Sequence, residues 1–417
     1  MAKARRSFAR SIVGTAVFAA LTSAAYAQDT LKVGLLATLE GPFAAGGQDA
    51  MRGAELALKA RNGMAGGKKI EFVKASSDAK PEVAVNATRK LVEQDKVQIM
   101  IGPLSGGEGI AVKDYSKTQP GVTFVNGSSG AQATTLVNQS PNFFRFNTEG
   151  AQWMVGLGEY AFKDKGYKRM ALISEDYSFP YSQVQGFMAG FCKAGGKMTK
   201  KVWVPLGNKD YSSAIAQLPK DVDALFVVLG GSDAVNFLTQ YEQAGGDKPM
   251  IGGTITVDQT VLGFKGKKRD GVIGTPTAGP MADSFDGADW KKFVADYKAN
   301  FKDGFPSPSL FAFLYYINTK AVLDALDAVN GDLSGGQAKF RETLAKMTLK
   351  TPVGDYVLDS NRQAVGPNFI TEVAKGADGN LYNKVVKVVA KVDQNLNLPK
   401  AEFDAMGLGS RDVPNCP

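Results

Sequence analysis

From residue 31 onward the chain alternates between short runs of β-branched and apolar residues and longer segments of helical periodicity, and this alternation constrains its fold most strongly. The expected strands are 31–39, 69–73, 98–101, 122–125, 170–174, 202–205 and 224–229. Helical segments lie between most of them, at 50–60, 81–94, 152–162, 183–192 and 234–244 among others. Alternation of this kind predicts an α/β fold with parallel sheets covered by helices on both faces.

The alternation occurs as two successive series. The first ends near residues 145–150, and the second continues to about residue 274. A segment rich in Pro, Gly and Thr (275–280) then leads to a long helical segment at 310–329 and to expected strands at 350–359 and 380–392. Because a chain of 417 residues is too long for one hydrophobic core of ordinary size, we expect two lobes.

The first 27 residues differ from the rest of the chain. Lys3, Arg5, Arg6 and Arg10 form a basic start, residues 12–21 are uncharged and mostly apolar, and Ala25-Tyr26-Ala27 has a small-x-small pattern. This predicts a secretory signal peptide over residues 1–27 and a periplasmic location; the alternative is a retained membrane anchor. No cysteine follows the expected cleavage point, so we expect no lipid anchor.

The composition excludes several kinds of chemistry. The chain has no histidine and only two cysteines, which removes the Ser-His-Asp triad, the commonest zinc ligand and thiolate clusters. We expect no enzyme, no metal and no cofactor; an exported enzyme would need a carboxylate or lysine mechanism. The net charge of +8 comes from scattered lysines and arginines, so nucleic-acid binding is not expected.

The two cysteines, Cys192 and Cys416, can pair in an oxidising compartment. A Cys192–Cys416 disulfide would hold a chain end that otherwise frays. The alternative is two unpaired thiols, with Cys192 buried on a helix.

Loops of small residues follow the expected strands in both series, at 40–47, 102–109, 126–130, 175–181, 230–233 and 252–254. Ligands of parallel sheets bind beyond the carboxyl ends of strands, where backbone N–H groups and helix N-termini suit an anionic group such as a carboxylate. The alternative for any one loop is a simple tight turn. None of the loops has a phosphate-binding motif. Tyr177, Phe179 and Tyr181 cluster around Pro180 and favour a loop that faces a cleft.

Read together, the motifs resemble a known family. They are Leu31-Lys32-Val33-Gly34-Leu35, Leu39-Glu40-Gly41-Pro42, Gly53-Ala54-Glu55-Leu56-Ala57, Ile101-Gly102-Pro103-Leu104-Ser105 and Gly230-Gly231-Ser232. In order and spacing the chain resembles the branched-chain amino acid type of substrate-binding protein of ABC importers. The resemblance implies the type I periplasmic-binding-protein fold, with two doubly wound parallel-sheet lobes joined by three crossover strands and closing on a ligand by a hinge.

The resemblance also implies discontinuous lobes and a membrane partner. The expected N-terminal lobe is 28–147 plus 277–351, and the expected C-terminal lobe is 148–276 plus 352–417. Cys192 and Cys416 would then share one lobe, which favours their pairing. The implied partner is the permease of an ABC importer, and we expect a monomer. A ligand-sensing receptor module of the same fold is the alternative.

The implied ligand site draws on both lobes. In the family a carboxylate is held by hydroxyls and backbone N–H groups at positions that match Ser105, Gly106, Ser128, Ser129 and Gly130, although Gly106 and Gly130 replace the usual hydroxyl residues. An aromatic cap matches Tyr181 or Tyr177, and Phe43 and Ser232 lie in adjoining loops. The acid that pairs with an amino-acid ammonium aligns with Thr254, and Glu149 is a possible replacement.

A site without that acid should reject amino acids, since a buried ammonium without a carboxylate costs several kcal/mol. We therefore favour an aromatic acid, such as a benzoate or hydroxycinnamate, as the ligand. If Glu149, Asp176 or Asp233 supplies the missing charge, an amino acid remains the alternative.

Overall fold

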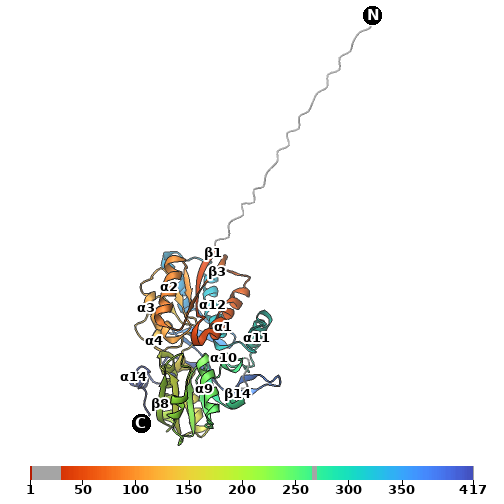
Figure 1. Cartoon of the computed structure of the whole chain (residues 1–417). Coiled ribbons are helices and arrows are strands. Elements are labelled where there is room, and N and C mark those ends of the chain that lie inside the picture. Colours follow the sequence, from red (N-terminus) through yellow and green to blue (C-terminus); the bar gives the residue numbers. More distant parts are fainter. Residues whose placement is uncertain (2–29, 265–269, 417) are drawn as a thin grey trace.

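The structure, a computed structural model, describes residue 1, residues 30–264 and residues 270–416, and it forms two α/β lobes that lie one above the other in Figure 1. The expected signal peptide, residues 1–27, lies outside the described residues except for Met1. No helix in the described part of the chain combines the length and the apolar character that crossing a membrane requires.

The upper lobe in Figure 1 is built on a sheet of order β2-β3-β1-β4-β5-β6. Its strands are β1 (Thr30–Thr38), β2 (Met64–Ala65), β3 (Lys68–Ser77), β4 (Ile99–Ile101), β5 (Thr123–Val125) and β6 (Phe143–Phe144). Its connecting helices are α1 (Ala44–Lys59), α2 (Pro81–Arg89), α3 (Gly106–Ser116) and α4 (Ala133–Leu136). All neighbours pair in parallel except β2 with β3. The central strand β1 is buried almost throughout, which explains its continuous apolar run.

The lower lobe contains a fully parallel sheet of order β10-β9-β7-β8. Its strands are β7 (Arg169–Glu175), β8 (Lys197–Val204), β9 (Ala224–Val228) and β10 (Met250–Gly252). Its helices are α5 (Gly150–Trp153), α6 (Leu157–Lys163), α7 (Ser178–Lys193), α8 (Ser212–Ala216), α9 (Gly231–Gln243) and α10 (Gln259–Leu262). The single helix expected at 152–162 is divided into α5 and α6, because Gly156 between them adopts a left-handed conformation with φ of 89°.

A third, antiparallel sheet has the order β11-β14-β13-β12, with β15 also paired to β14. Its strands are β11 (Pro276–Gly279), β12 (Leu349–Thr351), β13 (Gly354–Leu358), β14 (Ala364–Lys375) and β15 (Leu381–Val392). The single strand expected at 350–359 is a hairpin, because Gly354 has a φ of 127° and its carbonyl accepts a hydrogen bond from the Thr351 hydroxyl at 2.6 Å. Strand β14 was not expected from the sequence.

Segments far apart in the sequence complete the upper lobe. Helix α12 (Leu310–Ala328) packs along α1, while α11 (Ala288–Asn300) and α13 (Ala338–Lys346) lie beside them. The closest approach is at Gly53, where an added Cβ would lie 2.0 Å from the carbonyl oxygen of Ala312. Helix α12 therefore packs with the first series of strands, while the expected discontinuous lobes, 28–147 with 277–351 and 148–276 with 352–417, stay a prediction.

A buried arginine lies where the chain leaves the upper lobe after β6. Arg145 is fully buried and donates to the carbonyl oxygen of Ala131 at 2.7 Å and to the hydroxyl of Thr135 at 2.5 Å. Its Nε donates to the side-chain oxygen of Gln363, and the two backbones form an isolated parallel bridge. Burial lowers the pKa of Arg145 to about 10, opposed by the charge of Glu149, so the guanidinium stays positive at neutral pH. Its hydrogen bonds therefore join residues 131–135 to Gln363, more than 200 residues later in the chain.

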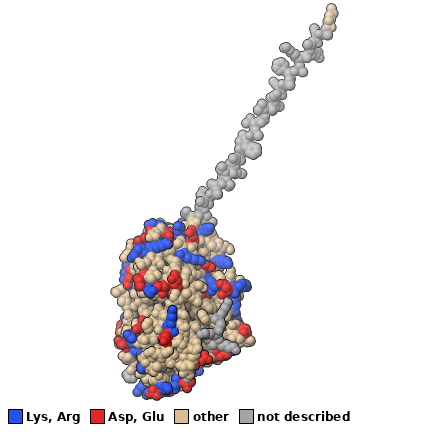
Figure 2. Space-filling view, in the orientation of Figure 1, with Lys and Arg blue, Asp and Glu red and all other residues tan. Residues whose placement is uncertain are grey.

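Two further features concern the surface and the cysteines. Acidic and basic side chains are interspersed over the face shown in Figure 2. Cys192, in α7, and Cys416 form a disulfide whose Cα atoms are 5.2 Å apart. The bond joins the end of the described chain to the lower lobe.

Substitution of Gly53 by alanine tests the contact between α1 and α12. Because the added methyl group would force the two helices apart, we expect Gly53→Ala to lower the free energy of unfolding by about 2–3 kcal/mol. Urea denaturation of the ligand-free protein measures this. Gly121→Ala is the control, since nothing lies within 4 Å of a Cβ there and its effect should stay within about 0.5 kcal/mol. Equal stability of the two variants would contradict the close packing.

Candidate functional site

A cavity lies between the two lobes, at the carboxyl ends of their parallel strands. It is narrow, with a free volume of about 20 Å³, room for about one water molecule. The residues that line it are Phe43, Leu104, Ser105, Gly106, Ser128, Gly130, Trp153, Tyr177, Phe179, Ile255, Leu310 and Phe311. The position agrees with the rule that ligands of parallel α/β sheets bind at this edge.

The upper lobe contributes the small and polar part of the lining. Ser105 and Gly106 lie at the start of α3, directly after the β4 loop, and Ser128 and Gly130 lie in the loop after β5. Glu108, one turn into α3, accepts a hydrogen bond from the backbone N–H of Ser105 at 2.9 Å and so fixes the start of the helix. Hydroxyls and a helix N-terminus on one wall suit an anionic ligand group.

The lower lobe contributes aromatic side chains from the loop after β7. The ring of Phe179 lies 5.6 Å from the ring of Trp153 at 66° and 6.3 Å from that of Tyr177. Phe179 also reaches across to the upper lobe: a Cβ on Gly130 would lie 2.8 Å from its ring, and a Cβ on Gly106 would lie 2.7 Å from its Cβ. These glycines are needed because any larger side chain would push the aromatic ring away.

A second contact between the lobes lies on the other side of the cavity. Phe43 and Phe311 both belong to the upper lobe; their rings are 6.4 Å apart, and Phe43 is 2% exposed. Gly231, at the start of α9, has a φ of 49°, and a Cβ there would lie 2.2 Å from the carbonyl oxygen of Pro42. The lobes are thus closed around the cavity.

Buried acids lie behind the aromatic wall and do not line the cavity. One carboxylate oxygen of Glu175 accepts a hydrogen bond from the backbone N–H of Gly230 at 2.9 Å. Burial, reinforced by the nearby Asp233, raises the pKa of Glu175 well above its ordinary value. Burial also raises the pKa of Asp233 to about 6 and, together with the charge of Glu175, raises that of Tyr177. Burial therefore favours the neutral forms of these groups.

The structure brings six of the eleven expected ligand-binding residues to the cavity, namely Phe43, Ser105, Gly106, Ser128, Gly130 and Tyr177. Two expected serines lie elsewhere. Ser129 is fully buried, with its hydroxyl against Gly109 of α3, and Ser232 donates to a carboxylate oxygen of Asp233 at 3.3 Å. Ser129 faces the interior of its lobe, whereas Ser232 is exposed at the surface.

Glu149 and Thr254 are also away from the lining because local groups use their side chains. Glu149 caps α5, and its carboxylate accepts hydrogen bonds from the N–H of Ala151 at 2.8 Å and of Gln152 at 3.2 Å. The hydroxyl of Thr254 donates to the carbonyl of Ala278 at 2.6 Å and accepts from the amide of Gln183 at 2.7 Å.

Of the two tyrosines that matched the aromatic cap, the structure places only Tyr177 at the cavity. Tyr181 turns away: its hydroxyl donates to Asp176, and its ring lies 5.1 Å from that of Trp203 at 78°. One helical turn after Tyr177, this side chain lies on the outer side of the loop.

Several lining residues were not expected from the sequence, namely Leu104, Trp153, Ile255, Leu310 and Phe311. Leu310 and Phe311 begin α12, nearly three hundred residues after the first loop, so no local pattern joins them to the site. Their only sequence signal is a helix start: Ser309 caps α12 by accepting from the N–H of Ala312 at 3.3 Å.

The lining can bind and orient a molecule but offers little for catalysis. It contains no carboxylate, lysine or thiol, and the chain has no histidine. Among the residues that the structure describes, no group of three or more Cys, Asp or Glu side chains is placed to hold a metal ion.

Comparison with known proteins identifies relatives over nearly the whole chain. A family model described as periplasmic binding protein matches residues 30–379. A curated relative from Brucella melitensis, named Leu/Ile/Val-binding protein homolog 6, is 27% identical over 394 residues, covering 91% of this chain and 97% of the relative.

Solved structures share the architecture. A solute binding protein of an ABC transporter from Rhodopseudomonas palustris BisB5, in complex with 3,4-dihydroxybenzoic acid, is 26% identical with a TM-score of 0.80, covering 88% of this chain and 99% of that chain. A leucine binding protein from Thermotoga maritima is 19% identical with a TM-score of 0.75, covering 86% of this chain and 99% of that chain, a likeness of fold alone. The fold expected from the sequence is confirmed.

The buried carboxyls predict how stability depends on pH. Burial raises the pKa of Glu149 to about 7, against the opposing effect of Arg145, and raises that of Asp258 to about 6. In the unfolded chain these two carboxyls titrate near pH 4. Their contribution to the stability of the folded protein is therefore complete below pH 4 and is lost as the pH rises through 6–7. We expect the Tm of the ligand-free protein to fall between pH 5 and 8.

Two variants test whether Glu149 causes part of this decrease in Tm. Glu149→Gln should flatten the decline in Tm, while Asp286→Asn, which alters an exposed carboxyl paired with Lys291, should leave it unchanged. A Tm that rises steadily from pH 5 to 8 in the parent protein would contradict the expectation.

Proposed function

Because the chain belongs to the family of periplasmic binding proteins, we propose that it binds an aromatic carboxylic acid between its lobes and delivers it to an ABC importer. Family and fold are those of transport proteins rather than enzymes. The proposal concerns the ligand class, for which a benzoate or a hydroxycinnamate is favoured.

The character of the cavity lining carries this proposal. Phe43, Trp153, Phe179 and Phe311 offer apolar faces, and no acid is among the lining residues. The flat apolar ring of an aromatic acid can pack against these side chains, whose own rings contact one another at edge-to-face and tilted angles. The relative from Rhodopseudomonas palustris is bound to 3,4-dihydroxybenzoic acid, which supports the same class of ligand here.

The ligand carboxylate would bind at the wall of the upper lobe. Ser105 and Gly106 at the start of α3, together with the hydroxyl of Ser128, are the polar groups of the lining on that side. The Ser128 hydroxyl donates to the carbonyl oxygen of Leu104 at 3.2 Å, and a ligand carboxylate would compete for this donor.

A branched-chain amino acid is the second candidate, supported by the name of the Brucella relative. Its ammonium would need a charged acceptor. Glu149 caps α5, Asp176 is bound by Tyr181 and pairs with Arg411, and Asp233 accepts from the N–H of Gly207 at 2.6 Å. Since other groups already use each of these acids, the aromatic acid is the better match.

Closure is the proposed mechanism. The hydroxyl wall belongs to the upper lobe and the ring of Phe179 to the lower one, so a ligand makes both sets of contacts only when the lobes close. Closure would then present a joined surface of two lobes to the permease.

A ligand panel tests the proposal directly. The protein is purified after export, unfolded and refolded with its disulfide intact to remove carried ligand, and scanned with 3,4-dihydroxybenzoate, benzoate, 4-hydroxycinnamate, leucine, isoleucine and valine. A ligand present at 100 times its Kd stabilises by about 2.7 kcal/mol, so a binder should raise Tm by several degrees. We expect aromatic acids to do so; a shift with leucine and none with the acids would refute the aromatic assignment.

A pair of serine variants tests the carboxylate position. A hydrogen bond to a charged group is worth about 1.5–3 kcal/mol, so Ser128→Ala should weaken binding of the best aromatic acid about 10- to 100-fold, measured by titration calorimetry. Ser232→Ala, whose hydroxyl lies outside the cavity lining, should bind as the parent does. Equal affinities for Ser128→Ala and the parent would remove Ser128 from the site.

A further inference from the structure

The last segment of the described chain returns to the lower lobe after β15. We define residues 393–416 as the C-terminal tail; it includes α14 (Lys400–Met406) and ends near β8 in Figure 1. Leu396 and Phe403 of the tail are buried against Ala151 of α5. Burial of these side chains packs the first half of the tail on the lobe.

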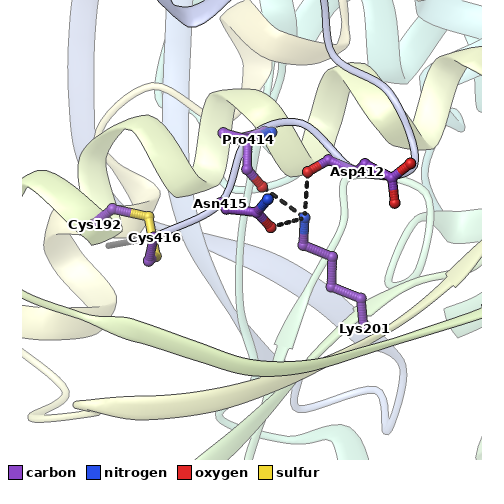
Figure 3. Close-up of a disulfide and its surroundings, with 6 residues drawn as sticks. All are labelled: Cys192, Lys201, Asp412, Pro414, Asn415 and Cys416. Carbon is purple, nitrogen blue, oxygen red and sulfur yellow. Dashed lines mark hydrogen bonds between the residues drawn. A yellow bond between two sulfur atoms is a disulfide. The ribbon is translucent and has the colours of Figure 1, made fainter.

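A disulfide and a set of hydrogen bonds hold the end of the tail (Figure 3). Cys416 is bonded to Cys192 near the end of α7. The ammonium of Lys201, on β8, donates to the carbonyl oxygens of Pro414 at 2.6 Å and Asp412 at 3.4 Å, and to the side-chain oxygen of Asn415 at 3.1 Å. Three acceptors from the tail on one cation hold this stretch against the sheet.

The middle of the tail is bound to the helix that begins at the cavity. Gln185 of α7 donates to the carbonyl oxygen of Gly407 at 2.6 Å, and its own oxygen accepts from the N–H of Gly409 at 2.8 Å. A Cβ on Gly409 would lie 2.7 Å from the carbonyl oxygen of Tyr181, so the tail lies directly on the first turns of α7.

The tail also contacts the loop that carries the aromatic wall. Arg411 lies 3.6 Å from one carboxylate oxygen of Asp176, and the hydroxyl of Tyr181 donates to the other. Asp176 directly precedes Tyr177, and Phe179 follows two residues later, and both of these line the cavity. A short path of contacts therefore joins the disulfide, the tail and the aromatic wall.

We propose that the C-terminal tail is a positioning element for the ligand site, which sets ligand affinity by holding residues 176–181 and the start of α7 in their binding arrangement. Arg411 acts through Asp176 and is a positioning residue without ligand contact. The affinity part of this proposal rests on the proposed function.

The physical reason is preorganisation. Rings that are already fixed bind with a smaller loss of conformational entropy than rings that the ligand must order. The Arg411–Asp176 pair is 58% and 26% exposed and would be weak alone, so the fastened tail is needed to keep the guanidinium beside the carboxylate.

The first experiment needs no ligand. Amide hydrogen exchange is measured on the exported, ligand-free full protein, on peptides that cover residues 175–185, for the parent, the double variant Cys192→Ser/Cys416→Ser, and Arg411→Ala. We expect faster exchange of this segment in both variants. Arg169→Ala is the matched control, because Arg169 is also half-exposed and paired with an aspartate, Asp221, but at the opposite end of β7; it should exchange as the parent does.

The second experiment measures affinity for 3,4-dihydroxybenzoate by titration calorimetry. We expect Arg411→Ala to raise Kd about 3- to 5-fold, as the loss of an exposed pair allows, and Arg411→Lys to restore most of the affinity. The double cysteine variant should lose at least as much, and Arg169→Ala should keep the parent Kd.

The outcomes separate the two proposals. Unchanged exchange at 175–185 in both variants would overturn the positioning role, whatever ligand the protein binds. A lower Tm with the parent Kd retained would also overturn it, since the tail would then be only a stabilising element. If the parent does not bind 3,4-dihydroxybenzoate or the other aromatic acids, the proposed function fails, while the exchange result still decides whether the tail orders the loop.

Discussion

A buried guanidinium at the passage between the lobes constrains the rest of the architecture. Arg145 cannot remain charged in the interior unless its donors are satisfied, and they reach the loop that follows β5, helix α4 and the segment before β14. The first two of these are contiguous and the third lies more than 200 residues later, so one side chain joins the end of the first series of strands to the returning chain. The loop with Ser128 and Gly130, which lines the cavity, is positioned by the same requirement.

The two lobes contribute different chemistry to the cavity, and in the closure that we propose this division would make binding selective. Hydroxyls and a helix N-terminus come from one side, and Tyr177 and Phe179 from the other. Because residues 106 and 130 are glycines, no side chain at these positions prevents Phe179 from approaching the polar wall. A ligand that satisfies only one wall gains nothing from closure, so recognition and conformational change are energetically the same event.

The sequence predicted the sheets well because parallel strands buried on both faces leave continuous apolar runs, as in β1, and the loops after them are the expected binding edge. The prediction failed where contacts between distant parts of the chain determine the position of a side chain. Glu149 and Thr254 were expected at the ligand, but nearby backbone groups occupy both side chains. Tyr177 and Tyr181 could not be distinguished until the turn of the helix was known. Phe311 reaches the site only through the packing of α12 on α1, and the hairpin of β12 and β13 depends on one glycine conformation.

The contact between Gly53 and Ala312 also affects the order in which the chain can fold. A chain that emerges from its N-terminus cannot complete the first lobe until α12 has appeared, about three-quarters of the way along the sequence. Until then the side of α1 that packs on α12 has no partner, although α1 can already pack on β1. Contacts of such high sequence separation slow folding, because a long loop must close before they form.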